Sequence, residues 1–515
     1  MNDLGTRTHL TVRQLIVALI AFVLVVGMVV FDRRPSNDSA RDDVTGGVAL
    51  IESPDAGSAS RGRATIPMID VASDDNRSEF AASTWFCPGV PANDGSISGS
   101  LVLGNRGEED VAATITHYGL GVEPIESTVS VPARSTVTVD ADGGLQAPFV
   151  STIVEIFGAN GSVEQFITHP AGNATTMCAD RTSSEWYFAD GFTAADSIEN
   201  IVLSNPFSDA SVVNVSFVTK ESGREPQNLQ GLVVPPRSVL TLQMGAQGAR
   251  NEPVLAVAVR ASSGRIVAGR SQHYLGQGRL GYVMNLGSMG LATDWWFADG
   301  EKGDGVTEQL VMFNPAADDQ QVSVVFLNGN DPATAIEPLV VSAPAGRVTV
   351  VDTSLLPGLP AGRYGINVSV VDDLTGTAAG IVVEQVINRR VGNTVGTSVV
   401  LGTPSLALST VWSAPSGFTP GLPDSLVVLN ATPDEATVSI EQVGPAGAVA
   451  IVGFESITVP AAGIVVIATP PGLPQAEFIV RASEPVVVQR MLSRGGELVG
   501  RTTALGLPHR LPGAP

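Results

Sequence analysis

Four copies of one pattern fill most of this chain and constrain its fold more than any other feature. Each copy opens with a tryptophan, and 18 to 20 residues later a short apolar run ends on an asparagine. The tryptophans are Trp85, Trp186, Trp295 and Trp412, and the asparagines are Asn105, Asn205, Asn314 and Asn430. A fixed period marks tandem structural units, and intervals of 101, 109 and 117 residues between the tryptophans match the size of a small domain. We therefore expect four similar domains in tandem.

Short strands separated by turns are the predicted elements of each copy. Apolar and polar residues alternate in segments such as 213–217 and 322–326, which puts one face of a strand inward. The chain has only 5% aromatic residues but 55 Gly and 34 Pro, so its cores must consist largely of small and β-branched side chains, which favour strands. About seven strands per hundred residues are typical of an antiparallel, immunoglobulin-like sandwich.

The predicted fold class is therefore all-β, with four tandem immunoglobulin-like antiparallel β-sandwich domains after one N-terminal transmembrane helix. The expected domains cover residues 84–182, 183–292, 293–409 and 410–515. A β-propeller is the alternative. Its repeats hold about four strands in roughly 40 to 50 residues, and the period here is about double that.

The first 83 residues divide into three predicted parts. Residues 1–14 are polar, and residues 15–31 form an apolar run of 17 residues, which just spans a bilayer. Charged residues follow at once, whereas a signal peptidase requires small residues, so an uncleaved anchor is preferred to a cleaved signal peptide. Residues 32–83 are rich in Asp, Ser, Gly and Pro and predict a flexible stalk. An apolar patch within it, at 66–69, is a candidate edge strand of the first domain.

The bulk of the chain is expected outside the cell, because an all-β build with a single cysteine pair suits an exported protein. The expected localisation is the cell membrane, with a single span, a cytoplasmic N-terminus at 1–14 and extracytoplasmic domains. The net charge of -22 repels phosphate backbones, and Lys220, Lys302 and the scattered arginines form no basic stripe. Nucleic acid is therefore not an expected partner.

The two cysteines predict a disulfide. Cys87 lies two residues after the first tryptophan, and Cys178 lies at the end of the same copy. In an oxidising compartment, a single pair that brackets one domain indicates a disulfide. Neither cysteine has a histidine or a second cysteine at ligand spacing, so no metal site is expected.

A longer motif follows the opening tryptophan in the two middle copies, Trp-Tyr-Phe-Ala-Asp-Gly at 186–191 and Trp-Trp-Phe-Ala-Asp-Gly at 295–300. The outer copies depart from it, with Trp-Phe-Cys-Pro-Gly at 85–89 and Trp-Ser-Ala-Pro-Ser-Gly at 412–417. Over roughly residues 84–508 the chain resembles exported actinobacterial repeat proteins with a domain of unknown function, whose copies open with Trp-x-Phe-Ala-Glu/Asp-Gly. The resemblance implies tandem β domains in a secreted or surface protein, and it implies no catalytic residues.

This motif has two interpretations. A large side chain at one strand position of every domain is usually the centre of a core, and an Asp-Gly pair is usually a turn. Alternatively, the tryptophans form an exposed platform for sugar rings, and the aspartates accept hydrogen bonds from sugar hydroxyls. The candidate binding residues are Trp186, Asp190, Trp295 and Asp299. Recurring glutamines at 165, 272, 385 and 489 are expected to be buried amides that pair with the backbone.

Catalytic signatures do not stand out in the sequence. The five histidines are isolated, no Gly-x-Ser-x-Gly elbow is present, and residues 138–149 lack the ligands of a calcium loop. We therefore expect neither an enzyme nor a bound cofactor. The expected function is binding or scaffolding in the cell envelope, with an envelope protein or glycan as the partner. The alternative is a glycan-active enzyme whose two carboxylates converge in a cleft between domains.

Overall fold

The computed structural model describes residues 66–69, 82–158, 161–328, 336–371, 378–417, 424–444, 447–468, 476–493 and 501–510. The chain divides into two compact units, Met1–Ala59 and Ser60–Pro515, and all described residues belong to the second. The anchor expected at 15–31 and most of the expected stalk lie outside the described residues. Within the described ranges, no helix is both long enough and apolar enough to cross a membrane.

The named strands pair antiparallel throughout, and the only described helices are short 3-10 segments, which confirms the all-β prediction. Copy one contains β1 (Ala82–Val90), β2 (Ser98–Asn105), β3 (Val111–Gly119), β4 (Ile125–Val131), β5 (Ser135–Asp140), β6 (Val150–Phe157), β7 (Gly161–Thr168) and β8 (Ala174–Met177). Copy two contains β9 (Glu185–Phe188), β10 (Ile198–Asn205), β11 (Ser211–Thr219), β12 (Gly223–Arg224), β13 (Leu232–Val234), β14 (Ser238–Gln243), β15 (Leu255–Ser263), β16 (Val267–Gly276) and β17 (Arg279–Leu286).

Copy three contains β18 (Asp294–Lys302), β19 (Val306–Asn314), β20 (Gln320–Leu327), β21 (Leu339–Ala343), β22 (Arg347–Asp352), β23 (Gly362–Val370), β24 (Val382–Val391), β25 (Thr394–Leu401) and β26 (Thr403–Pro404). Copy four contains β27 (Ser409–Ala414), β28 (Ser425–Asn430), β29 (Ala436–Gly444), β30 (Gly447–Ala450), β31 (Ile457–Val459), β32 (Ile464–Ala468), β33 (Phe478–Ser493), β34 (Arg501–Leu505) and β35 (Leu507–Pro508). The 3-10 segments are η2 (Ala194–Asp196), η3 (Gln227–Leu229), η4 (Met244–Gln247), η6 (Thr353–Leu355) and η7 (Ser405–Ala407).

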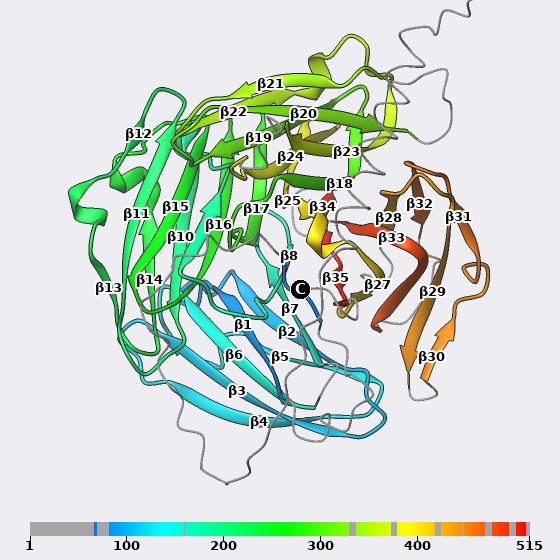
Figure 1. Cartoon of the computed structure of the whole chain (residues 1–515). Coiled ribbons are helices and arrows are strands. Elements are labelled where there is room, and N and C mark those ends of the chain that lie inside the picture. The colour runs from blue at the N-terminus through cyan, green and yellow to red at the C-terminus, as the bar shows by residue number, and fades with distance from the viewer. Residues whose placement is uncertain are drawn as a thin grey trace, which may run out of the picture. The chain divides into compact units, whose positions relative to one another are not determined.

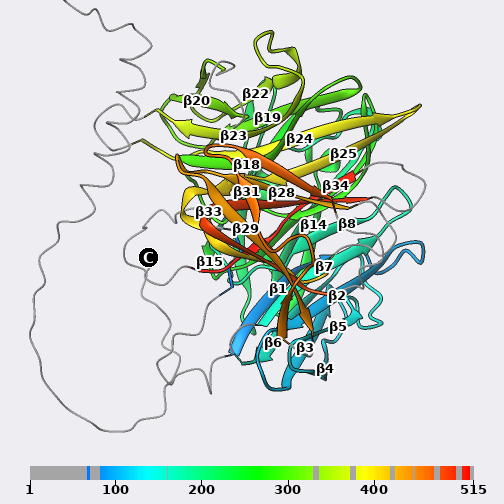
Figure 2. The ribbon, with the colours of Figure 1, turned by 90° about the vertical axis from the view of Figure 1, so that its right-hand side faces the viewer.

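Two antiparallel sheets recur in every copy and resemble a β-sandwich. In copy one their strand orders are β1-β6-β3-β4 and β5-β2-β7-β8, and side chains of both sheets share one core. Copy two has β12-β11-β15-β9 and β14-β10-β16-β17, and copy three has β21-β20-β23-β18-β26 and β22-β19-β24-β25. In copy four the 16-residue strand β33 pairs in both sheets and makes nine strands continuous (Figures 1 and 2).

The opening tryptophan of each copy lies in the core. None of the four is more than 2% exposed. The indole N–H of Trp186 donates to the carbonyl of Ile266 and that of Trp295 to the carbonyl of Ile381, both at 3.0 Å. In these two copies large aromatic surface is thus buried while the polar end of the ring keeps a partner. The packing interpretation of the tryptophan is therefore confirmed.

The asparagine at the end of the apolar run joins two turns in every copy. In copy two, Nδ2 of Asn205 donates to the carbonyls of Asp209 and Val234 at 2.7 and 3.0 Å, and Oδ1 accepts from the N–H of Phe207 at 3.1 Å. The other three asparagines make equivalent contacts. An amide suits this position because it donates twice and accepts at the same time.

One further strand per copy follows the strand that carries the recurring glutamine. Strands β8, β17, β25 and β34 follow the glutamine strands β7, β16, β24 and β33 and extend their sheets. In copy two the chain reverses at Gln277 and Gly278, both of which have a positive φ. Two such residues form a turn whose twist matches a hairpin. Copy one thus has eight described strands and copies two to four have nine each, against about seven expected per hundred residues.

These added strands bring the copies together. Strand β8 packs against β17, β17 against β25, β25 against β34, and β34 against β8 (Figure 1). The contacts between copies therefore form a closed circuit, in which copy four touches copy one. The core of copy one also includes Tyr282 and Met284 of copy two and Leu507 of copy four. Residues Ser60–Pro515 form one compact unit, and the domain boundaries drawn from the sequence remain predictions.

The apolar patch at 66–69 belongs to this circuit. The N–H of Ile69 donates to the carbonyl of Pro508 at 2.9 Å, and the N–H of Arg510 donates to the carbonyl of Ile69 at 2.8 Å. Ile69 thereby pairs with the end of copy four, although its side chain packs in the core of copy one. The expectation that the patch pairs as an edge strand of the first domain was wrong.

Candidate functional site

At the junction of copies two and three, the motif that opens copy two binds a carboxylate of copy three. Strand β9 ends at Phe188, and the two N–H groups that follow point out of the sheet. Those of Ala189 and Asp190 donate to Oε2 of Glu384 in β24, at 2.8 and 2.6 Å. A buried N–H without an acceptor costs free energy. Here the acceptor comes from the next copy.

Arg270 of β16 neutralises this carboxylate. Its Nη1 and Nη2 donate to the two oxygens of Glu384 at 3.1 and 2.8 Å, and both side chains are at most 1% exposed. Burial raises the pKa of Glu384, and the charge of Arg270 opposes that rise. A buried ion pair of this kind depends on both partners, because removal of one leaves the other charge without compensation.

Two other junctions use the same device. The N–H groups of Ala298 and Asp299 in copy three donate to Oε1 of Gln489 in copy four. The N–H of Ser416 in copy four donates to Glu164 in copy one at 3.1 Å. We call Glu164, Glu384 and Gln489 the junction acceptors. Arg490 pairs with Glu164, so this ion pair closes the circuit between the last copy and the first.

The junction of copies one and two is built differently. Its motif places Pro88, which has no N–H, where the middle copies have alanine. Pro88 packs against Gly269 of β16, where an added Cβ would lie only 2.6 Å from the proline Cβ. Nearby, the hydroxyls of Tyr118 and Ser204 are 2.6 Å apart. Close apolar packing replaces the charged acceptor at this junction.

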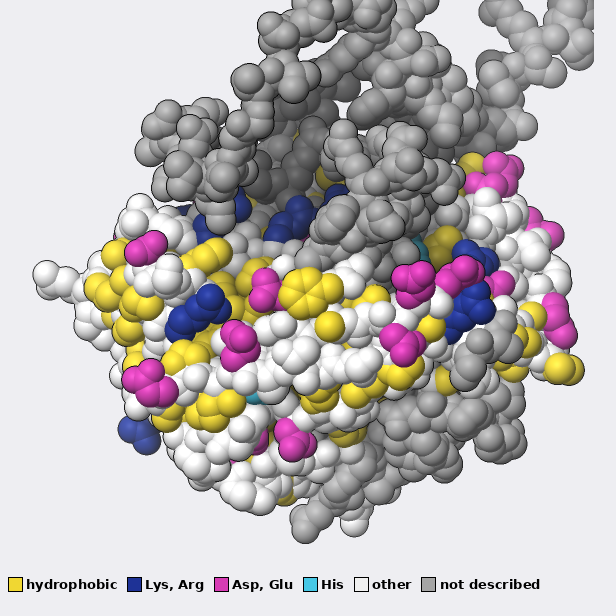
Figure 3. Space-filling model, turned by 90° about the horizontal axis from the view of Figure 1, so that it is seen from below, with side chains coloured by type: hydrophobic (Ala, Val, Ile, Leu, Met, Phe, Trp, Pro, Cys, Tyr) yellow, Lys and Arg dark blue, Asp and Glu magenta, His cyan; other side chains and the backbone are white. Residues whose placement is uncertain are grey.

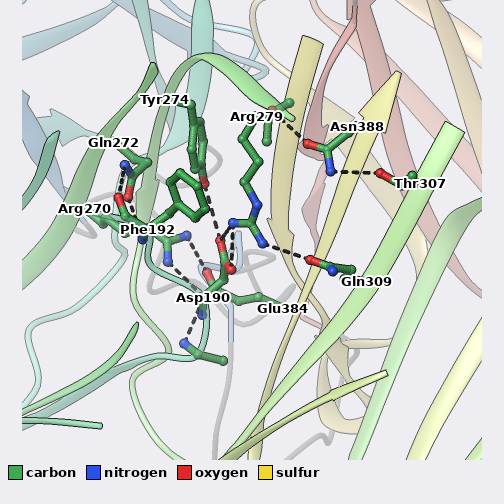
Figure 4. Close-up of polar contacts among 12 residues, drawn as sticks. Asp190, Phe192, Arg270, Gln272, Tyr274, Arg279, Thr307, Gln309, Glu384 and Asn388 are labelled. Carbon is green, nitrogen blue, oxygen red and sulfur yellow. Dashed lines mark hydrogen bonds and ion pairs between the residues drawn. The ribbon is translucent and has the colours of Figure 1, made fainter. Parts of the chain in front are cut away.

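The side chain of Asp190 forms a second buried ion pair beside the first. Arg279, at the start of β17, donates from Nη1 to both carboxylate oxygens at 3.0 Å, and the hydroxyl of Tyr274 lies 3.3 Å away. From Nη2, Arg279 donates to Oε1 of Gln309 in copy three, also at 3.0 Å. Figure 4 shows that Arg279 lies between Asp190 and Gln309 and so joins the two copies.

Glu199 of β10 is a buried carboxyl beside these pairs. Neither of its oxygens accepts a hydrogen bond, and the group presses on Gly191, where a Cβ would lie 2.4 Å from Oε1. Burial raises the pKa of Glu199 to about 8, and the neighbouring carboxylates add to the rise against the charge of Arg270. At neutral pH this side chain is therefore mainly an uncharged acid.

A groove opens at the surface of the same junction, with a volume of about 660 Å³. We call it the junction groove. It is lined by Phe192, Lys220, Pro253, Val254, Gln277, Gly278, Arg279, Thr307, Gln309, Val348, Val350, Asp352 and Asn388. Amide and hydroxyl groups, one aromatic ring, four aliphatic residues, two cations and one carboxylate thus face one space. The volume lies in the range of sites that bind small molecules.

A second cavity lies where β8, β17, β25 and β34 meet. It holds about 50 Å³ and is lined mainly by apolar side chains, with Ile66 and Pro67 among them. Its volume is far below that of a typical ligand site. The junction groove is therefore the better candidate.

The residues expected to bind sugars are interior. Trp186, Asp190, Trp295 and Asp299 are all 0% exposed. Asp190 pairs with Arg279, and Asp299 pairs with Arg363 and Arg389. The structure thus does not show the exposed aromatic platform, because the rings fill the cores and the carboxylates neutralise arginines. The burial of these four side chains argues against their direct contact with a ligand.

Two further sequence predictions are confirmed. Cys87 and Cys178 form the predicted disulfide, which joins residues 91 apart. The four recurring glutamines are buried and pair with the backbone, as Gln165 does with Gly89 through donation at 2.7 Å and acceptance at 3.4 Å. In Gln489, however, the backbone partner belongs to the preceding copy.

Sequence reasoning missed the residues that join the copies, among them Arg270, Arg279 and Glu384. A signal was present, since a glutamate directly precedes the recurring glutamine at Glu164 and at Glu384. Its meaning depends on contacts between copies, which no pattern within one copy specifies. In the described part of the chain, no three His, Cys, Asp or Glu side chains are placed to hold a metal ion.

Comparisons with known proteins give a family but no activity. A family model described as a family of unknown function (DUF5719) matches residues 158–418. A search of curated proteins found no match. Among solved structures, one of a tetra-tandem repeat in the extending region of a large adhesion protein aligns with 83% of this chain and 99% of its own, at 13% identity and a TM-score of 0.09. A score that low does not show a shared fold.

Proposed function

The chain belongs to the DUF5719 family, whose function is unknown, and from its interlocked copies we propose a binding or scaffolding protein of the cell envelope. In this proposal residues 15–31 anchor the chain with a single span, and four immunoglobulin-like domains lie outside the membrane. The partner is an envelope protein or glycan, which the junction groove binds.

The junctions are the observation that carries this proposal. The buried ion pair Arg270–Glu384 joins copy two to copy three. The buried ion pair Arg490–Glu164 joins copy four to copy one. Such contacts fix the copies relative to one another, so little conformational entropy remains to be lost when a partner binds. A groove between two fixed copies is a preformed site, which suits binding or scaffolding.

A glycan-active enzyme is the weaker candidate. Hydrolysis of a glycosidic bond usually requires two carboxyl groups that face one substrate. Asp352 is the single carboxylate among the residues that line the junction groove. Asp190, which is buried beside the groove, is committed to Arg279.

Nucleic acid is disfavoured as a partner on charge. The chain carries a net charge of -22. On the described part of the face seen in Figure 3, carboxylates and a few basic side chains are spread among polar and apolar ones rather than gathered in a basic stripe. Phosphate recognition depends on such a stripe.

Cross-linking in cells tests the proposal. Full-length protein should stay in the membrane fraction after a carbonate wash and should enrich specific envelope components in a cross-linking pull-down. The purified chain should hydrolyse no cell-wall glycan or peptide. Turnover of such a polymer that a single Asp or Glu substitution abolishes would favour the enzyme instead.

A further inference from the structure

We propose that the junction groove binds a neutral sugar chain that carries N-acyl groups, which deepens and rests on the binding function proposed above. The inference comes from the direction of the hydrogen bonds in the groove, from its balanced charge and from its aliphatic walls. Figure 4 shows the side chains that set these directions.

Arg279 fixes the orientation of the Gln309 side-chain amide. Arg279 can only donate, so the amide oxygen of Gln309 must face it, at 3.0 Å from Nη2. The carboxylate of Asp190 holds the guanidinium in place with two further contacts of 3.0 Å. The amide nitrogen of Gln309 therefore faces away from Arg279, and its two N–H groups are donors on the groove wall.

A second chain of hydrogen bonds also ends in a donor group at the groove. The backbone N–H of Leu280 donates to Oγ1 of Thr397 at 3.0 Å, and that hydroxyl donates to Oδ1 of Asn388 at 2.8 Å. Nδ2 of Asn388 then donates to Oγ1 of Thr307 at 3.0 Å. The hydroxyl of Thr307 already accepts, so its own proton is available as a donor.

The N–H donors of Gln309 and the hydroxyl of Thr307, two residues apart on β19, together favour an acceptor on the ligand. A carbonyl oxygen meets this requirement without a charge, as in an N-acyl group on a sugar. Three charged side chains line the groove, Lys220, Asp352 and Arg279, and Asp190 compensates the charge of Arg279, so the charges balance. The net charge of -22 disfavours a polyanionic ligand.

The walls suit the rest of such a ligand. Val348 and Val350 of copy three face the groove with Pro253 and Val254 of copy two. Sugar rings and acyl methyl groups present C–H surfaces that pack against aliphatic side chains. The volume of about 660 Å³ admits a short oligosaccharide.

Calorimetry with two matched probes tests the inference on the full-length chain in detergent. Tetra-N-acetylchitotetraose, called chitotetraose below, and cellotetraose have the same β-1,4-linked backbone, but only the first carries N-acetyl groups. We expect chitotetraose to bind and cellotetraose to bind at least tenfold more weakly or not at all. Equal binding of the two, or no binding of chitotetraose, would overturn the proposal.

The variant Gln309→Glu separates recognition from folding. A glutamate keeps the size of the side chain and gives Arg279 a better acceptor, but it removes the N–H donors. We expect the same melting temperature or a higher one, with chitotetraose binding at least tenfold weaker. Asn200→Ala, at the equivalent position of copy two outside the groove, is the matched control and should bind like the wild type. Equal loss in both variants would contradict a groove site.

The same variant keeps this inference distinct from the proposed function. If wild type and Gln309→Glu capture the same envelope component in cells and neither binds chitotetraose, the binding function stands and the N-acyl sugar is wrong. If chitotetraose binds the groove but the pull-down captures nothing, the sugar site stands and the scaffolding function is wrong.

Discussion

At the scale of single residues, one repeated position carries two different buried acids. Glu199 in copy two has no hydrogen-bond donor to either oxygen, whereas Glu308 in copy three accepts from Thr353, Tyr364 and Gln385. Burial raises the pKa of both, to about 8 for Glu199 and to about 7 for Glu308. The same backbone site thus supports an isolated acid in one copy and a networked acid in the next.

Glu199→Gln should stabilise the protein at neutral pH. From about pH 4.5, the ordinary pKa, to about pH 8, the unfolded chain ionises Glu199 while the folded chain keeps its proton. The wild type therefore loses stability as pH rises through this window. We expect the variant to gain about 3 kcal/mol at pH 7 and almost nothing at pH 4. Thermal melts at both pH values check this.

Glu308→Gln is the matched control for that experiment. Burial raises the pKa of Glu308 as well, so removal of its charge should also stabilise the folded state at pH 7. An amide cannot accept from all three donors around this position, and the loss of roughly 1 to 3 kcal/mol should cancel most of that gain. An equal gain in stability at both positions would show that the hydrogen-bond partners do not matter.

The opening tryptophans should behave as core residues. Trp186→Ala or Trp295→Ala removes a fully buried side chain and should lower the free energy of unfolding by roughly 3 to 5 kcal/mol. Urea denaturation measures this. A variant that unfolds normally but loses binding to envelope polysaccharide would instead favour a direct ligand contact.

At the scale of elements, the junction of β9 with β24 depends on one acceptor. Glu384→Ala removes the acceptor of two backbone N–H groups and leaves the guanidinium of Arg270 buried without a partner. We expect a loss of about 3 to 5 kcal/mol, much of it recovered when Arg270→Leu is added. Denaturation of both single variants and the double variant gives the coupling.

The exposed pair Arg481–Glu441 offers a control for this cycle. Its arginine is 48% exposed, so Glu441→Ala should cost less than about 1 kcal/mol. Equal losses for Glu384→Ala and Glu441→Ala would mean that the junction does not depend on its buried ion pair.

The sequence predicted the strands that form the core of one copy better than the strands that form the contacts between copies. Alternating residues around Val213 and a recurring tryptophan report on one core, so β11 and the buried indoles could be predicted. Strands β17 and β25 pack on each other and not only on their own copies. Their apolar residues therefore meet a neighbour that no periodicity within the copy specifies. The candidate site was missed for the same reason, because Arg279 and Gln309 meet only across a junction.

At the scale of the whole molecule, the disulfide should affect more than the first copy. Its loop of 91 residues encloses copy one, and the core of that copy includes Tyr282 of copy two and Leu507 of copy four. Loss of the bond should cost on the order of 4 to 5 kcal/mol in the chain-entropy model. We expect the double variant Cys87→Ser, Cys178→Ser to shift a shared unfolding transition in calorimetry. A shift confined to one of several separate transitions would show that the copies unfold independently.

Because Ile69 pairs with the end of copy four, the circuit of copies does not depend on which copy comes first in the chain. The N–H of Ile69 lies 2.9 Å from the carbonyl of Pro508, so the start and the end of the described unit are neighbours. A short peptide could join these two points, and the chain could be opened between β17 and β18 instead. In such a circular permutant every junction would keep its partners. The copies would still follow one another in the same order around the circuit, but the chain would begin at a different copy.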